Sequence, residues 1–100
     1  MAYQPKPLDN FPVELSADLK SLIEVLARNN HEVWAKRRME EGWKWGPLKD
    51  ETKKETPSMI PYEQLSESEK AYDRDNAIET LRTILALGYK IEPPTRRKGD

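Results

Sequence analysis

"HEVWAKRRMEEGWKWGP", residues 31–47, holds the single histidine and all three tryptophans of this 100-residue chain. Its first part contains no glycine or proline before Gly42, so it continues a helical pattern that begins further upstream. After Gly42 that pattern ends, and Trp43 and Trp45 alternate with Lys44 as residues of a short strand do. The stretch therefore predicts the end of a long helix followed by an aromatic-rich loop.

The helix that ends in this stretch is predicted to begin near Ser16, a residue type preferred at the N-cap. Gly42 supplies its C-terminal stop. Between them, the residues of one mostly apolar face recur at steps of three and four: Leu19, Leu22, Ile23, Leu26, Asn30, Val33, Trp34 and Arg37. At a rise of roughly 1.5 Å per residue, this helix is about 40 Å long. If it breaks, the sequence favours the pair Asn29–Asn30, because asparagine is a mediocre helix former.

The segment after the tryptophans is predicted to be an exposed loop. Three prolines interrupt it, and residues 49–55 form a run of lysines and acidic residues. The stretch "PSMIPY", residues 57–62, is expected to be extended and to place Met59, Ile60 and Tyr62 on the core.

A second helix is predicted to begin near Ser66, because Ser66 and Glu69 have the spacing of a capping box. Gly88 is placed to end it, and its apolar face consists of Ala77, Ile78, Leu81, Ile84 and Leu85. The alternating stretch "YKIE", residues 89–92, is expected to pair with residues 43–45. The predicted fold class is mainly α: two long packed helices with an aromatic-rich loop and a short two-stranded ribbon.

The composition indicates one small domain without a strong charge bias. The chain has 17 basic and 18 acidic residues, which argues against nucleic-acid binding because such modules carry a basic excess. The absence of cysteine excludes disulfides and cysteine metal sites. No segment has the apolar run of a signal peptide or a membrane span. We expect a cytoplasmic protein without membrane contact, with an extended arm at residues 1–12, a domain at residues 13–92 and a polar tail at residues 93–100.

A series of ordered motifs runs through most of the chain. Asparagine, histidine and tryptophan at fixed spacing are followed by an arginine, Gly-Trp, Pro-Tyr, Glu-Lys, Asp-Arg and finally Leu-Gly-Tyr. These motifs occupy Asn29, His31, Trp34, Arg38, Gly42, Trp43, Trp45, Gly46, Pro57, Pro61, Tyr62, Glu69, Lys70, Asp73, Arg74, Thr80, Leu81, Leu87, Gly88 and Tyr89. The series resembles the ryanodine-receptor repeat, or RyR domain, over about residues 13–91.

This resemblance implies a mostly helical fold with short strands, and a role in ligand sensing with nucleotide-like molecules as a candidate class. It does not imply a calcium channel, because the chain has one repeat and no pore segment. We therefore expect a stand-alone, non-catalytic binding module. In the calcium-release channels the repeats occur as tandem pairs, which suggests that this single repeat forms a homodimer with a ligand between two copies of Trp34.

His31, Trp34 and Arg38 are spaced by one helical turn and so share one helix face. In the functional interpretation, a flat ligand stacks on the indole of Trp34 while Arg38 holds an anionic group. In the alternative interpretation, Trp34 belongs to the core and Arg38 pairs with a nearby carboxylate. The residues alone leave both interpretations open.

Trp43 and Trp45 face opposite ways if their segment is a strand. We expect Trp43 to be the core residue and Trp45 to extend a groove beside Arg38, although both tryptophans could be structural. The loop is expected to be fastened to the helices by Tyr62 and the Asp73–Arg74 pair. Structural roles are expected for the following motif residues: Asn29, Gly42, Gly46, Pro61, Tyr62, Asp73, Arg74 and Gly88.

The sequence offers little support for metal or enzyme chemistry. His31 is the single histidine and has no cysteine beside it, so no metal site is expected. Residues 73–76, "DRDN", lack the glycine of a calcium loop. Phosphate-loop and nucleophile motifs are also missing, so we expect neither a cofactor nor enzyme activity. Two functions remain: recognition of a small, flat, anionic ligand such as a nucleotide, or docking of a partner protein on the same aromatic patch. A concave pocket favours the ligand, and a flat patch favours the partner.

Overall fold

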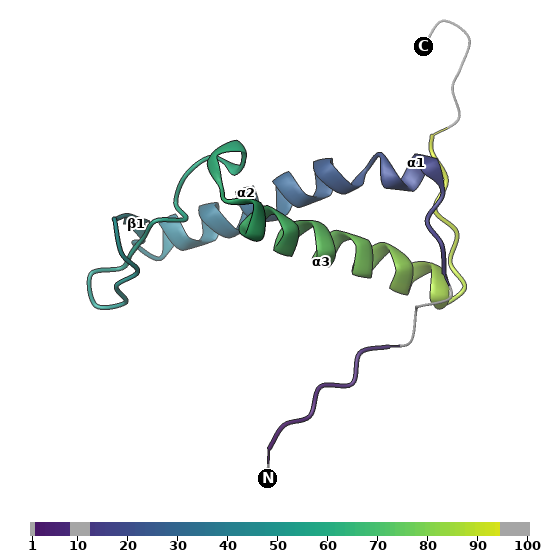
Figure 1. Ribbon diagram of the computed structural model, residues 1–100, viewed down its shortest axis with the longest axis horizontal. Coiled ribbons are helices and arrows are strands. Elements are labelled where there is room, and N and C mark those ends of the chain that lie inside the picture. Colours follow the sequence, from purple (N-terminus) through teal and green to yellow (C-terminus); the bar gives the residue numbers. More distant parts are fainter. Residues whose placement is uncertain (1, 9–12, 95–100) are drawn as a thin grey trace, which may run out of the picture.

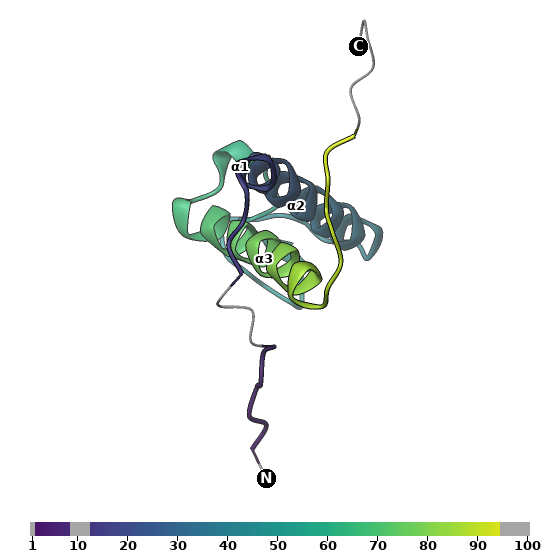
Figure 2. The same cartoon turned by 90° about the vertical axis from the view of Figure 1, so that its right-hand side faces the viewer.

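Two long helices, packed side by side and running in opposite directions, form the body of the molecule (Figure 1 and Figure 2). They are α2 (Ile23–Glu40) and α3 (Glu67–Ala86), and the short helix α1 (Ala17–Lys20) precedes α2. The connection between α2 and α3 contains the strands β1 (Lys44–Trp45) and β2 (Glu55–Thr56) and the 3-10 turn η1 (Tyr62–Gln64). The computed structural model describes residues 2–8 and 13–94. The predicted mainly α fold with a short strand pair is confirmed.

The predicted first helix is bent, and the bend lies earlier than the sequence suggested. Ser16 caps α1 by accepting a hydrogen bond from the backbone N–H of Leu19 at 3.3 Å, as predicted. The interruption falls at Ser21–Leu22, whereas Asn29 and Asn30 lie inside the continuous α2, so the expected break there was wrong. The Ser21 hydroxyl donates to the carbonyl of Asp18 at 2.6 Å. This side-chain bond competes with the helical backbone pattern and closes the first turn locally.

The remaining helix ends follow the predicted local chemistry. Gly42 follows the end of α2 with a φ of 97°, and Gly88 follows the end of α3 with a φ of 96°. Both values lie in the left-handed region that glycine adopts without a Cβ penalty. The capping box of Ser66 and Glu69 is present at the start of α3, with both reciprocal hydrogen bonds formed. These ends are therefore fixed by residues close to them in sequence.

The strand pair has a different partner from the one predicted. Lys44 pairs with Glu55 and Trp45 with Thr56, in parallel, and residues 89–92 form no strand. Because α2 and α3 are antiparallel, the chain leaving α3 emerges beside α1, at the opposite end of the molecule from β1 (Figure 1). The expected pairing with residues 89–92 was therefore wrong, and β1 pairs within its own loop.

Six of the buried side chains form two clusters. One contains Leu15, Leu19 and Leu81, and the other contains Ala27, Tyr62 and Leu65. Of the residues that the extended segment was predicted to place on the core, Met59 and Tyr62 are buried and Ile60 is half-buried. The loop residues 51–54 are exposed as predicted, whereas Glu55 is part of β2.

The predicted arm and tail extend beyond the described part of the chain. Residues 2–8 are exposed and have no regular secondary structure. Residues 9–12 of the arm and residues 95–100 of the tail lie outside the described residues. The domain boundaries at residues 13 and 92 stay a prediction.

Gly46 is expected to be intolerant of any side chain. It is buried, and a Cβ added to it would lie 2.6 Å from the Cβ of Glu55 on the neighbouring strand. Gly46→Ala should therefore force β1 and β2 apart and lower the free energy of unfolding by about 1–3 kcal/mol. Urea denaturation measures this loss. Leu48→Ala, at an exposed position of the same loop, is the matched control and should change stability by about 0.5 kcal/mol or less. Equal stability of the two variants would contradict the close contact.

Candidate functional site

A pocket of about 390 Å³ lies between α2 and α3. Its volume is within the range of small-molecule sites. Side chains of both helices form its walls, and residues of the connecting segment complete it. The lining residues are Asn30, His31, Trp34, Ser58, Leu65, Glu69, Tyr72, Asp73 and Asn76. The site is thus an open depression of the surface with a mixed polar and apolar lining.

The α2 wall of the pocket is aromatic. Trp34 is half-buried, and its ring stacks on that of His31 with the centroids 5.5 Å apart and the planes inclined by 25°. His31 is buried, and its Nε2 lies 2.6 Å from the backbone carbonyl of Ile60. A carbonyl oxygen only accepts, so Nε2 carries the proton and donates it. This hydrogen bond fixes the imidazole, and the imidazole in turn supports one face of the indole.

The α3 wall carries two carboxylates in different states. Glu69 accepts hydrogen bonds from the hydroxyl of Ser58 and from the backbone and hydroxyl of Ser66. The bond from Ser58 is the largest cause that lowers the pKa of Glu69. Asp73 makes no hydrogen bond or ion pair with any residue in the described ranges 2–8 and 13–94, and burial raises its pKa. Asp73 is therefore the carboxylate whose oxygens remain available to a ligand.

Arg38 does not line the pocket with His31 and Trp34. Its guanidinium lies over the ring of Trp43, 5.1 Å from the centroid, and 3.5 Å from the carboxylate of Glu41. The aromatic face of Trp43 and the Glu41 carboxylate both attract the cation away from Trp34. The predicted strip is therefore divided into a pocket part, His31 and Trp34, and an outer part, Arg38.

The other two tryptophans lie outside the core. Trp43 is half-buried and belongs to neither buried cluster, so the expectation of a core position was wrong. Trp45, in β1, is 54% exposed. Neither lines the pocket, and neither stacks on Trp34. Of the three tryptophans, Trp34 is the one that the structure places in this cavity.

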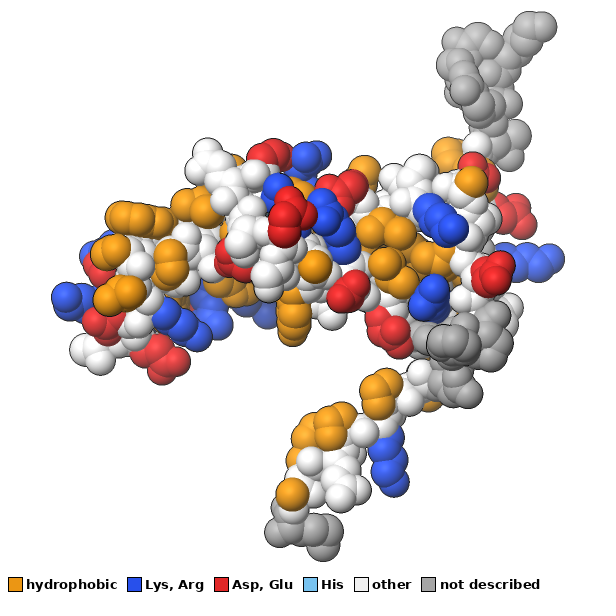
Figure 3. All heavy atoms as spheres, in the orientation of Figure 1, with side chains coloured by type: hydrophobic (Ala, Val, Ile, Leu, Met, Phe, Trp, Pro, Cys, Tyr) orange, Lys and Arg blue, Asp and Glu red, His pale blue; other side chains and the backbone are white. Residues whose placement is uncertain are grey.

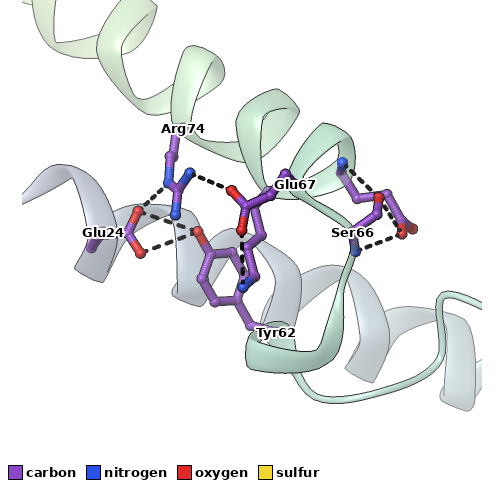
Figure 4. Close-up of polar contacts among 7 residues, drawn as sticks. Glu24, Tyr62, Ser66, Glu67 and Arg74 are labelled. Atoms are coloured by element: carbon purple, nitrogen blue, oxygen red, sulfur yellow. Dashed lines mark hydrogen bonds and ion pairs between the residues drawn. The ribbon is translucent and has the colours of Figure 1, made fainter.

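A polar network beside the pocket fastens η1 to both long helices (Figure 4). The carboxylate of Glu24 on α2 accepts from the guanidinium of Arg74 on α3, and the Tyr62 hydroxyl lies 3.4 Å from both carboxylate oxygens. Arg74 also lies 3.5 Å from Glu67. The guanidinium of Arg74 is the main cause that lowers the pKa of Glu24, whereas burial raises that of Tyr62. This arrangement fits the fastening role expected for Tyr62 and Arg74.

Several lining residues were not singled out by sequence reasoning. The signal that was available is the spacing of Glu69, Asp73 and Asn76, which are four and three residues apart and so share one face of α3. Asn30 lies beside the predicted Asn29, which does not line the pocket. Asp73, expected to be structural with Arg74, instead lines the pocket. Pro61 lines a smaller cavity of about 240 Å³ behind His31.

Two further features of the described residues concern metal ions and membranes. Among residues 2–8 and 13–94, no three histidine or acidic residues are close enough together to hold a metal ion. In the same ranges, none of the helices is long and apolar enough to cross a membrane.

Comparison with known protein families identifies a match over nearly the whole chain. The sequence profile described as RyR domain matches residues 3–93. The matched region contains both helices, the β1–β2 loop and every residue that lines the pocket. The match begins ten residues before the domain boundary that the sequence analysis expected.

Proposed function

The chain belongs to the RyR domain family, and on that premise we propose that it is a non-catalytic module that binds a small planar ligand, such as the base of a nucleotide. The ligand occupies the pocket between α2 and α3. One observation carries this proposal: the same cavity brings together the half-buried indole of Trp34 and the carboxylate of Asp73, which has no hydrogen bond or ion pair with residues 2–8 or 13–94. An aromatic ring and a free acceptor are the two groups that a heterocyclic base uses.

The charge of the pocket determines how an anionic ligand would lie. Glu69 and Asp73 repel a phosphate from the interior, so only the flat part of a nucleotide fits between the helices. Arg38 lies four residues beyond Trp34 on α2, roughly 6 Å along the helix axis. Its ion pair with Glu41 is exposed and long, so it costs little to exchange for a phosphate. We therefore place the base on Trp34 and the phosphate towards Arg38.

A thermal-shift screen with a panel of nucleoside monophosphates tests the proposal. A ligand that binds the folded state raises the melting temperature by mass action. Trp34→Leu keeps an apolar side chain but removes the aromatic face, and it should weaken binding about tenfold or more, because base–aromatic stacking is worth about 1–3 kcal/mol. Trp45→Leu is the matched control, since it removes an exposed tryptophan that does not line the pocket. It should retain the full shift.

Two results would contradict the proposal. If no nucleotide shifts the melting temperature of the wild-type protein, the pocket does not bind this class of ligand. If Trp45→Leu abolishes the shift while Trp34→Leu retains it, the ligand binds at the β1 end of the molecule instead. The first result rejects the ligand class, and the second rejects the cavity between the helices as its site.

A second candidate function is the docking of a partner protein at that β1 end. Met39, Trp45 and Leu48 are 59%, 54% and 76% exposed. Hydrophobic side chains gather on this end of the surface (Figure 3). Contiguous exposed apolar side chains are typical of protein-interaction sites. This function predicts that Trp45→Leu weakens binding of a partner without altering any response to nucleotides.

A further inference from the structure

We propose that the pocket selects a guanine-type base, a planar ring that presents two adjacent N–H donors to the carboxylate of Asp73. The inference rests on the proposed function and names the chemical class of its ligand.

Two polar side chains of the pocket, Glu69 and His31, already make hydrogen bonds within the protein. Three donors from Ser58 and Ser66 already engage the carboxylate of Glu69, so it belongs to the capping structure of α3. His31 is engaged through Nε2 with the carbonyl of Ile60. By contrast, Asp73 lacks a hydrogen-bond donor among the described residues. The recognition of ligand donors therefore falls to Asp73.

A carboxylate has a defined preference among heterocyclic edges. It offers two parallel acceptors and no donor, so it pairs best with two N–H groups that lie side by side. Guanine has such an edge, formed by the ring N1–H and the exocyclic amino group at C2. Adenine presents one amino group beside a ring nitrogen acceptor, and that acceptor would face a carboxylate oxygen. Hypoxanthine presents the N1–H alone.

The partial burial of Asp73 also favours a ligand that donates hydrogen bonds to its carboxylate. Asp73 is half-buried, and burial is the largest cause that raises its pKa, with the nearby Glu69 carboxylate raising it further. Burial thus disfavours the charged form, and no hydrogen-bond donor among residues 2–8 and 13–94 compensates it. Two N–H groups from a ligand would supply that compensation.

The remaining lining groups suit the rest of a purine. Trp34 provides the stacking surface from α2. Asn30 and Asn76 line the pocket from opposite helices, and each amide provides both donors and an acceptor for the other polar atoms of the ring. The pocket therefore combines the carboxylate of Asp73, which has no hydrogen bond to residues 2–8 or 13–94, with two amides that can both donate and accept.

The test measures the affinities of guanosine, inosine, adenosine and xanthosine 5′-monophosphates by isothermal titration calorimetry. The wild-type protein should bind the guanosine compound most tightly, with the inosine and adenosine compounds weaker by about tenfold or more, because a site that is built for a donor rejects analogues that lack it. Asp73→Asn replaces one acceptor with an N–H₂ donor. It should weaken the guanosine compound by a similar factor and favour the xanthosine compound, whose C2 oxygen accepts from that amide.

A control variant separates recognition from folding. Asp75→Asn removes a carboxylate from α3 at an exposed position that does not line the pocket, and it should retain the wild-type order of affinities. The melting temperature of Asp73→Asn should equal or exceed that of the wild type, because the substitution removes a partly buried charge that has no ion pair with residues 2–8 or 13–94.

The outcomes distinguish this inference from the function on which it rests. Tight binding of the adenosine compound that depends on Trp34, without preference for the guanosine compound, would overturn the inference and leave the proposed function in place. An equal loss of all four compounds in Asp73→Asn would also overturn it, since Asp73 would then not read the donor pattern. If none of the four compounds binds, the inference is overturned. If no compound of the thermal-shift panel binds either, the proposed function is rejected as well.

Discussion

Tyr62→Ala is expected to remove a large part of the stability of the fold. Tyr62 is 2% exposed, and it packs with Ala27 and Leu65 where η1 meets α2. Truncation of a buried aromatic residue to alanine costs about 3–5 kcal/mol through lost burial and the cavity that remains. Small domains are stable by only about 5–15 kcal/mol in total. We therefore expect the variant to unfold at a much lower urea concentration, measured by far-ultraviolet circular dichroism.

The contacts of the ring explain why collapse around the cavity should be limited. The cationic groups of Arg28 and Lys70 lie 5.7 and 5.8 Å from the centroid of the Tyr62 ring. Long charged side chains do not move into an apolar cavity without losing hydration. The space left by the ring would thus stay unfilled, which favours the upper part of the expected range.

Tyr62→Phe is the matched control for this variant. It keeps the ring and removes only the hydroxyl, which lies 3.4 Å from each carboxylate oxygen of Glu24. Such long hydrogen bonds contribute modestly, so the loss should be about 1 kcal/mol or less. If phenylalanine proves as damaging as alanine, the hydroxyl and its network with Arg74, and not the buried ring, hold η1 in place.

The helix ends could be predicted from sequence because their causes are local. Ser16 and Ser66 accept hydrogen bonds from backbone N–H groups three residues away. Gly42 and Gly88 each have a positive φ, which glycine adopts without a Cβ penalty. The partner of β1 could not be predicted in this way. A strand of two residues has no periodicity, and its pairing follows from the antiparallel arrangement of α2 and α3, which is a tertiary property.

The candidate site shows the same division between local and tertiary information. His31 and Trp34 were predicted together because their spacing on one helix brings them together. Asp73 and Arg74 were grouped because they are adjacent, but consecutive helical residues point about 100° apart. One therefore lines the pocket while the other reaches Glu24. Only the packing of α3 against α2 determines which of the two faces the cavity.

His31→Ala is expected to lower the free energy of unfolding by about 2–4 kcal/mol, since it removes a buried ring and leaves a carbonyl without its donor. The imidazole is buried between Trp34 and Tyr62, with ring centroids 5.5 and 6.4 Å away. Its Nε2 also ties α2 to the carbonyl of Ile60 in the connecting segment. The variant should therefore lose stability in urea denaturation, and it should bind nucleotides more weakly because Trp34 loses its support.

His31→Gln separates the hydrogen bond from the ring. The glutamine amide carries an N–H₂ group that reaches about as far as Nε2, so it retains a donor for Ile60 but not the stack on Trp34. Its stability should lie between those of the wild type and His31→Ala. A stability equal to that of the wild type would mean that the imidazole stabilises the fold only through its hydrogen bond to the carbonyl of Ile60. A stability equal to that of His31→Ala would mean that the stacked ring, which also orders the aromatic wall of the pocket, is the contribution that matters.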